Sequence, residues 1–262
     1  MTDILIPALS IGAIGLFFGA LLAFASIVFK VEKDERIDMI CECLPGANCG
    51  GCGYTGCAAL AEAIVAKGES ATKCNLMTEE KNSYICKIMG VEAKAVEKKT
   101  ARLKCSGTSE HCTNKYDFTG IDDCFTAMQL NGGPKACQFG CMGLGSCMAA
   151  CEFGAISIDG GIAHIDDDKC VGCARCVAAC PKSIIELVPK KSRVYVSCSS
   201  TDKGAAVKNY CSAGCIGCKI CEKKCEFGAI KVEDNLAKID YTKCTNCGAC
   251  AEACPKKIII AM

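Results

Sequence analysis

Cys170-Val-Gly-Cys-Ala-Arg-Cys-Val-Ala-Ala-Cys180-Pro181 and Cys244-Thr-Asn-Cys-Gly-Ala-Cys-Ala-Glu-Ala-Cys254-Pro255 are the two segments that decide the fold. Each has the spacing C-x2-C-x2-C-x3-C-P, which is typical of loops that bind iron–sulfur clusters. In paired runs of this kind, three cysteines ligate one 4Fe–4S cluster and the fourth ligates the other. The spacing therefore predicts clusters held jointly by loops that lie side by side.

The two runs belong to an internal repeat. Sliding the chain by 74 residues superimposes nine cysteines without a gap: Cys124, Cys137, Cys141, Cys147, Cys151, Cys170, Cys173, Cys176 and Cys180 fall on Cys198, Cys211, Cys215, Cys221, Cys225, Cys244, Cys247, Cys250 and Cys254. Each copy also predicts a short β-hairpin, with a turn at Asp159-Gly160-Gly161 in the first and the second within Ala229–Ile239. The repeat predicts tandem bacterial-type two-cluster ferredoxin domains.

Three ligand sets follow from the run spacing. They are Cys151, Cys170, Cys173 and Cys176; Cys225, Cys244, Cys247 and Cys250; and Cys215, Cys218, Cys221 and Cys254.

A fourth set departs from the pattern because Leu144 occupies the position that matches Cys218. Cys137 lies just upstream, so we predict the set Cys137, Cys141, Cys147 and Cys180. A three-iron cluster or an empty site is the alternative there.

A different motif precedes the repeats. Cys49, Cys52, Cys57 and Cys74 have the spacing C-x2-C-x4-C-x16-C, with a helix expected over Ala58–Lys67. Glycines between these cysteines let backbone N–H groups approach cluster sulfurs. The motif predicts a fifth 4Fe–4S cluster, so we expect at least five in all. Gly51, Gly53 and Gly56 match G-x-G-x-x-G, but no strand precedes them, so nucleotide binding is rejected.

Several cysteines lie outside these sets. Cys41, Cys43 and Cys86 fit the role of small buried apolar residues, although Cys41 and Cys43 are also alternative ligands. The other cysteines either form an extra cluster or are buried thiols, and both interpretations stay open. They are Cys105, Cys112, Cys124, Cys198 and Cys211.

Composition limits the function classes. Cysteine supplies 28 of 262 residues, more than in most folded chains, and the repeated C-x2-C spacing suits reduced, ligated thiols better than disulfides. Zinc ribbons use two separated C-x2-C pairs, so zinc is disfavoured. The net charge of +1 gives no sign of nucleic-acid binding. The sequence shows no catalytic constellation of its own.

The N-terminus predicts a membrane anchor. Ile4–Phe29 holds no charged residue, and a helix of this length spans a bilayer with some tilt. Lys30, Lys33 and Arg36 follow it and no basic residue precedes it, which places the C-terminal bulk in the cytoplasm. We therefore expect a single-pass protein of the cell (inner) membrane.

The expected fold class is α+β, divided into consecutive parts. They are a transmembrane anchor (1–30), the first cluster module with a helical linker (31–100), a first two-cluster ferredoxin-like repeat (101–190) and a second one (191–262).

Together, the N-terminal helix, the Cys49–Cys74 module and the tandem repeats resemble the B subunits of Rnf complexes. Leu44-Pro-Gly-Ala-Asn-Cys-Gly-Gly-Cys-Gly-Tyr54 is the most specific part of the resemblance, which covers essentially the whole chain. The cysteine-rich extended form is similar to versions in anaerobic bacteria such as clostridia. Thr55 stands where the family often has proline.

This resemblance implies an electron-transfer subunit of a translocase, the ion-pumping ferredoxin:NAD⁺ oxidoreductase. Reduced ferredoxin is the implied donor, and other membrane and flavin-bearing subunits, where hydride transfer occurs, are the implied partners. The ion is Na⁺ or H⁺. The Lys94–Lys104 stretch is a candidate ferredoxin-docking face, and a solvated helical face is the preferred interpretation of its charges.

Rival functions are a polyferredoxin of another membrane complex, such as a hydrogenase, and a redox-sensor maintenance factor of the Rsx type. A zinc-binding scaffold is the structural rival.

Overall fold

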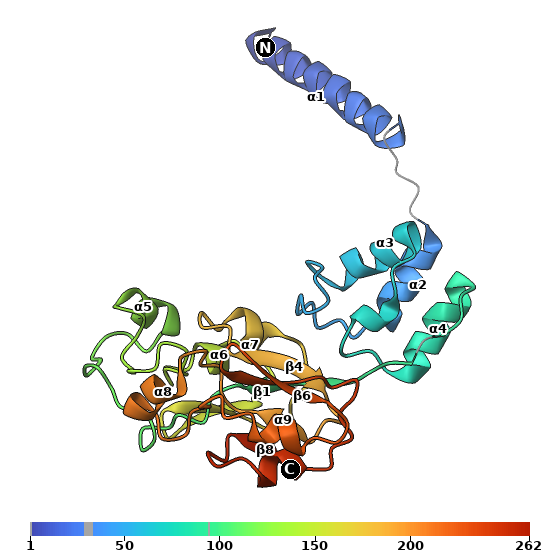
Figure 1. The fold of residues 1–262 in the computed structure, drawn as a ribbon. Helices are drawn as coiled ribbons and strands as arrows, with labels where there is room; N and C mark the ends of the chain where they lie inside the picture. The colour runs from blue at the N-terminus through green and yellow to red at the C-terminus, as the bar shows by residue number, and fades with distance from the viewer. Residues whose placement is uncertain (1, 29–33, 94) are drawn as a thin grey trace.

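The computed structural model describes residues 2–28, 34–93 and 95–262 (Figure 1). Helix α1 (Thr2–Val28) lies apart from the remaining elements in this view, and its side chains are described for residues 12–25. Within the side chains so described, no helix is both long and apolar enough to cross a membrane. Lys30, Lys33 and Lys94, on which sequence predictions rest, lie outside the described residues.

An N-terminal module (residues 35–89) follows α1. It comprises α2 (Glu35–Cys43), α3 (Cys57–Lys67), the short 3₁₀ helix η1 (Ala71–Lys73) and α4 (Glu79–Met89). Its core contains Ile40, Leu60, Ile64, Met77 and Ile85; burial of such side chains contributes about 1.5–3 kcal/mol each. The predicted helix over Ala58–Lys67 is confirmed by α3.

The first ferredoxin-like repeat is built from two antiparallel strand pairs. Strand β1 (Lys99–Leu103) pairs with β4 (Ile185–Pro189), and β2 (Ile156–Asp159) pairs with β3 (Ile162–Ile165). Short helices α6 (Ser146–Ala149) and α7 (Arg175–Ala178) follow cysteine-rich loops and pack against the strands. The predicted hairpin at Asp159-Gly160-Gly161 is confirmed as the β2–β3 turn.

The second repeat has the same plan. Strand β5 (Val194–Val196) pairs with β8 (Ile259–Ala261), and β6 (Ile230–Glu233) pairs with β7 (Leu236–Ile239). Helices α8 (Gly204–Tyr210), α9 (Ile220–Lys224) and α10 (Ala249–Glu252) complete it. The second predicted hairpin is confirmed, because β6 and β7 pair antiparallel across a turn at Asp234 and Asn235.

The Lys94–Lys104 stretch differs from the predicted helical face. Residues 99–103 form strand β1, and Thr100–Leu103 are buried against β4. Successive side chains of a strand point to opposite faces, so burial of four in a row means that β1 is covered on both faces, which a count of its charges does not reveal.

The two repeats meet along β1 and β5. Arg102 of β1 forms a largely buried ion pair with Asp167, and its guanidinium lies 5.0 Å from the centre of the Tyr195 ring of β5. Just beyond these strands, Ser106 Oγ donates a hydrogen bond to Ser197 Oγ (2.7 Å). The residues that follow β1 and β5 are therefore brought face to face.

This arrangement revises the internal alignment. Cys105 stands two residues after β1, and Cys198 stands two residues after β5, so these two cysteines are structurally equivalent. The gapless comparison had matched Cys124 with Cys198. The first repeat carries an insertion, because 31 residues separate Cys105 from Cys137 whereas 12 separate Cys198 from Cys211. The inserted segment contains α5 (Cys124–Gln129).

Candidate metal centres

The N-terminal module gathers its four predicted ligands. Cys49, Cys52, Cys57 and Cys74 line one cavity of about 380 Å³, between the Cys49–Cys57 loop and η1. Asn48 Oδ1 accepts a hydrogen bond from the Cys57 backbone N–H (2.8 Å), which fixes the loop at the start of α3. Four thiols around one cavity form a donor set that suits a 4Fe–4S cluster.

The first repeat reaches this cavity directly. Cys173 lines it together with the module's own cysteines. Asn75 Nδ2 donates a hydrogen bond to the Gly172 carbonyl (2.8 Å), and Gly51 lies so close to the Cys173 carbonyl that a side chain there would overlap it. The module and the first repeat therefore share a contact built at their cysteine loops.

In the second repeat, the structure brings both predicted sets together. Cys215, Cys218, Cys221 and Cys254 line a cavity of about 330 Å³. Cys225, Cys244, Cys247 and Cys250 line another of about 350 Å³. Cys218 and Cys247 are exposed, so each site has one ligand at the surface.

The first repeat also brings one predicted set together. It comprises Cys151, Cys170, Cys173 and Cys176, which correspond to Cys225, Cys244, Cys247 and Cys250 of the second repeat. Burial, followed by the neighbouring charges of Cys170, Cys173 and Cys151, raises the pKa of the Cys176 thiol to about 12. The Ala155 N–H donates to Cys151 Sγ (3.4 Å), as the Ala229 N–H does to Cys225 Sγ (3.3 Å) in the second repeat. Thiols with a raised pKa hold their protons until a metal displaces them, so ligation here is coupled to proton release.

The site that carries Leu144 differs from the sequence prediction. Burial, followed by the charges of Cys141, Cys124 and Cys180, raises the pKa of the Cys147 thiol to about 12. Cys124 therefore lies beside Cys147, as Cys141 and Cys180 do, and it also packs against Leu144.

Helix α5 places Cys124 at this site. Asp123 caps the helix by accepting from the Thr126 N–H (2.8 Å), and its other oxygen accepts from Ser146 Oγ (2.8 Å). Ser146 Oγ in turn accepts from the Cys124 N–H (2.7 Å). Since Ser146 is next to Cys147, this network ties the inserted helix to the ferredoxin loop.

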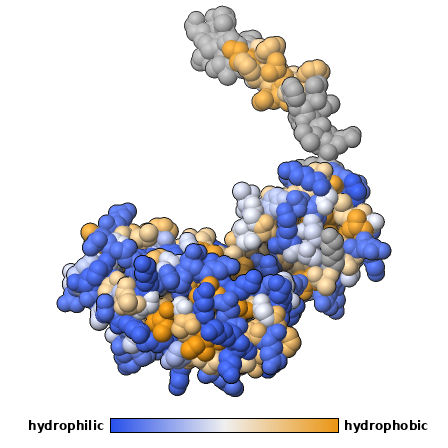
Figure 2. All heavy atoms as spheres, viewed as in Figure 1, coloured by the Kyte–Doolittle hydropathy of each residue, from blue (hydrophilic) through white to orange (hydrophobic). Residues whose placement is uncertain are grey.

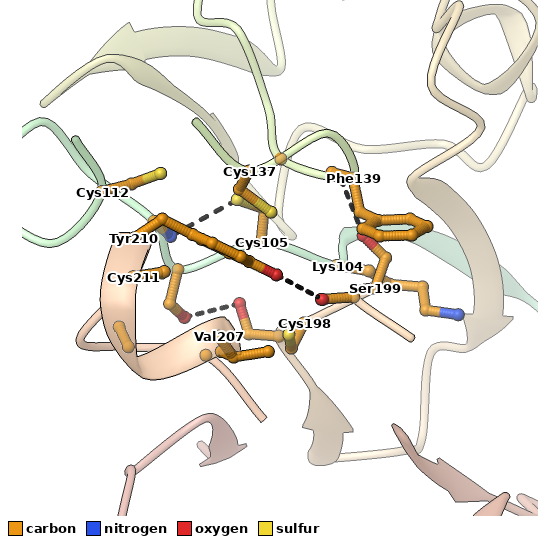
Figure 3. Close-up of a pocket in the computed structure, with 17 residues that line it drawn as sticks. Lys104, Cys105, Cys112, Cys137, Phe139, Cys198, Ser199, Val207, Tyr210 and Cys211 are labelled. Carbon is orange, nitrogen blue, oxygen red and sulfur yellow. Dashed lines mark hydrogen bonds between the residues drawn. The ribbon is translucent and has the colours of Figure 1, made fainter. Parts of the chain in front are cut away.

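Cys137, which the sequence placed at the Leu144 site, lies elsewhere. It lines a cavity of about 330 Å³ between the two repeats, here named the inter-repeat pocket (Figure 3). The cysteines lining this pocket are Cys105, Cys112, Cys137, Cys198 and Cys211. The sequence leaves an extra cluster open for Cys105, Cys112, Cys198 and Cys211, but it predicts Cys137 at the Leu144 site. The C-x3-C pairs Cys137–Cys141 and Cys211–Cys215 were the signal that could have joined Cys137 to this group.

A site for a single metal ion is a different case from a cluster site. In the part of the chain that the structure describes, no three His, Cys, Asp or Glu side chains converge closely enough to hold one metal ion. Three of the predicted ligand sets instead line the cavities described above.

Family comparisons match the same regions. An Fe-S cluster family matches residues 44–75, and two 4Fe-4S dicluster domain families match residues 136–184 and 214–259.

Relatives match nearly the whole chain. The B subunit of the ion-translocating oxidoreductase complex of Methanosarcina acetivorans is 43% identical over 261 residues, which cover 99% of both chains. The B subunit of the Na(+)-translocating ferredoxin:NAD(+) oxidoreductase complex of Acetobacterium woodii is 44% identical over 99% of this chain and 78% of its own. The proton-translocating counterpart of Clostridium ljungdahlii is 39% identical over 95% of this chain and 89% of its own.

Proposed function

The chain belongs to the family of B subunits of ion-translocating oxidoreductase (Rnf) complexes, and from this premise we propose how its cysteines serve electron transfer. It is an electron-transfer subunit of a ferredoxin:NAD⁺ oxidoreductase that couples the reaction to Na⁺ or H⁺ translocation. Reduced ferredoxin is the proposed donor. The flavin-bearing and membrane subunits of the complex are the proposed acceptors, and the flavin carries out hydride chemistry.

The observation that carries this proposal is the succession of grouped thiols along the chain, three sets of which line a cavity. When bound, a 4Fe–4S cluster supplies one-electron transfer, at a potential set by charge, hydrogen bonds and exposure. The chain's residues provide the ligands and N–H donors and bring adjacent sites into contact. This succession favours a relay over a substrate-binding enzyme.

We assign five ligand sets, with Cys124 in place of Cys137 at the Leu144 site. They are Cys49, Cys52, Cys57 and Cys74; Cys151, Cys170, Cys173 and Cys176; Cys124, Cys141, Cys147 and Cys180; Cys215, Cys218, Cys221 and Cys254; and Cys225, Cys244, Cys247 and Cys250.

Contacts between sites suggest an order. Cys173 touches both the module's cavity and its own set, and Cys176 is an electrostatic neighbour of Cys147. The module therefore adjoins the Cys151 set, which adjoins the Leu144 site. Electrons entering at one end pass through these sites in this order or its reverse.

Helix α1 is the proposed single-pass anchor. Its described side chains are apolar and exposed, including Leu16, Phe17 and Leu22, whereas the visible face of the remaining chain is largely polar (Figure 2). An exposed apolar surface of this kind requires a covering, and a bilayer supplies one. Alkaline extraction of membranes tests the anchor: the full chain stays in the pellet, and a chain that starts at Asp34 is released.

Anaerobic rapid mixing with reduced ferredoxin tests the function. Reduced ferredoxin bleaches the visible absorption of the cluster-loaded chain, and added salt slows the reaction because the docking surfaces carry charge. Oxidised ferredoxin is the control. A cluster-loaded chain that takes no electrons from reduced ferredoxin would refute the donor assignment.

A further inference from the structure

The inter-repeat pocket belongs to none of the five ligand sets. All five of its cysteines are buried, with 3–9% of their surface exposed. With the adjoining open space counted, the pocket extends over about 330 Å³, the same as the Cys215 cavity and close to the 350 and 380 Å³ of two other sites counted in the same way. Five buried thiols that line one pocket of the same extent as the assigned sites need an explanation.

Four of the thiols form two equivalent pairs. Cys105 follows β1 as Cys198 follows β5, and Cys137 precedes Cys141 by four residues as Cys211 precedes Cys215. Each repeat therefore contributes one thiol just after β1 or β5 and one thiol four residues before Cys141 or Cys215. Figure 3 shows these side chains coming from the two repeats toward the same pocket.

The same four thiols share a local geometry with predicted ligands. The backbone N–H two residues further on donates to the sulfur of Cys105, Cys137, Cys198 and Cys211. The assigned ligands Cys74, Cys141 and Cys173 have the same i+2 arrangement. N–H groups aimed at sulfur are a feature of cluster sites.

Cys112 differs from these four. It lies on the inserted segment, its thiol donates to the Thr113 carbonyl (3.7 Å), and the N–H that reaches its sulfur comes from Cys137. Cys112 also hydrogen-bonds with the Cys211 thiol. It has no equivalent in the second repeat, so it is the fifth, supporting thiol.

A buried cation stands beside the pocket. Lys135 is 4% exposed, and its Nζ donates to the carbonyls of Gly107 (2.6 Å) and Gly161 (2.8 Å). Among the described residues no carboxylate forms an ion pair with it. Its charge acts on Cys112 and Cys141. A buried ammonium requires a counter-charge, and a cluster with four thiolates is anionic.

We propose that the inter-repeat pocket holds a sixth 4Fe–4S cluster, ligated by Cys105, Cys137, Cys198 and Cys211, with Lys135 as its buried counter-charge. The proposal rests on the proposed function, since it adds a site to the same relay.

The position of this site gives it a role. The Cys141 N–H donates to Cys105 Sγ (3.4 Å), and the Cys215 N–H donates to Cys198 Sγ (3.3 Å). Cys141 belongs to the Leu144 site and Cys215 belongs to the first site of the second repeat. The sixth cluster therefore lies between the two ferredoxin repeats and joins their cluster pairs into one path.

The test compares a double variant, Cys105→Ala with Cys198→Ala, with a control, Cys86→Ala, which changes a thiol outside every ligand set. The full chain is purified without oxygen and analysed for iron, acid-labile sulfide and zinc. We expect the double variant to lose about four iron and four sulfide per chain relative to wild type. The control keeps the wild-type content, and neither protein contains zinc.

Several results would overturn the proposal: a folded double variant with full iron content, zinc that is present in wild type and lost in the variant, or a Cys112–Cys211 disulfide in the oxygen-free protein. Loss of a cluster from Cys112→Ala but not from Cys137→Ala would also do so.

If the double variant does not fold, native mass spectrometry of wild type decides, since six clusters support the proposal and five refute it. An iron-free wild type would instead refute the proposed function.

Discussion

Gly51 of the N-terminal module packs directly against the carbonyl of Cys173 in the first ferredoxin repeat. A Cβ at Gly51 would overlap that carbonyl, and both partners are backbone atoms that cannot turn aside. The contact sets how closely the module's cavity approaches the Cys151 set.

Gly51→Ala should therefore separate the module from the repeat. Overpacking of this kind costs about 1–3 kcal/mol. We expect wild-type iron content but slower electron exchange between the module and the repeat, measured by rapid-mixing spectroscopy. Gly46→Ala is the control, because its positive φ strains an alanine locally while the space around it is open. Equal rates in wild type and Gly51→Ala would contradict this view of the interface.

A cysteine at position 144 should restore the cluster that a Cys124→Ala variant loses at the Leu144 site. Cys124→Ala should remove one ligand, which yields loss of the cluster or a three-iron form detectable by EPR. Adding Leu144→Cys restores a thiol at the position that Cys218 occupies in the second repeat. The combined variant should regain the four-iron signal. Cys137→Ser should leave this site unchanged, and a loss there would return Cys137 to the Leu144 site.

The cap of α5 has a pH dependence. Hydrogen bonds from the Thr126 N–H, and then from Ser146 and Thr126 hydroxyls, lower the pKa of Asp123. A lowered folded-state pKa means that the carboxylate stabilises α5 above its unfolded pKa of about 3.9 and that this effect is lost as pH falls through the folded value. Once the intrinsic pH dependence of amide exchange is divided out, the Thr126 amide should therefore exchange faster at acid pH.

Asp123→Ala should show that faster exchange already at neutral pH. Helix α8, which has no side-chain cap, is the internal reference within each sample. An α5 that exchanges equally in wild type and Asp123→Ala would exclude the cap as the element that positions Cys124.

The joint between the repeats depends on Arg102. Arg102→Ala would leave Asp167 unpaired and remove the contact with Tyr195. Breaking a buried pair costs about 3–5 kcal/mol, and the lower end applies because Asp167 is partly exposed. The thermal midpoint of the loaded protein should fall. Lys191→Ala, which breaks an exposed pair with Glu97, should change it little.

The spacing of neighbouring residues was enough to predict the features that depend on short stretches of the chain. The loops of Cys170–Cys180 and Cys244–Cys254, the two hairpins and α3 follow from neighbouring residues, and the structure confirms the hairpins and the helix. The Cys124 and Cys105 groupings depend on where an insertion falls and on how two repeats pack. A gapless comparison cannot register an insertion between Cys105 and Cys137, so it matched Cys124 with Cys198.

The cluster relay itself is tested most directly by electron titration. The chain is purified anaerobically and titrated with reduced ferredoxin while EPR follows the metal centres. We expect a coloured, iron-rich protein that accepts several electrons per chain and develops the signals of reduced 4Fe–4S clusters. A well-folded, colourless chain with little iron that accepts no electrons would contradict the cluster relay.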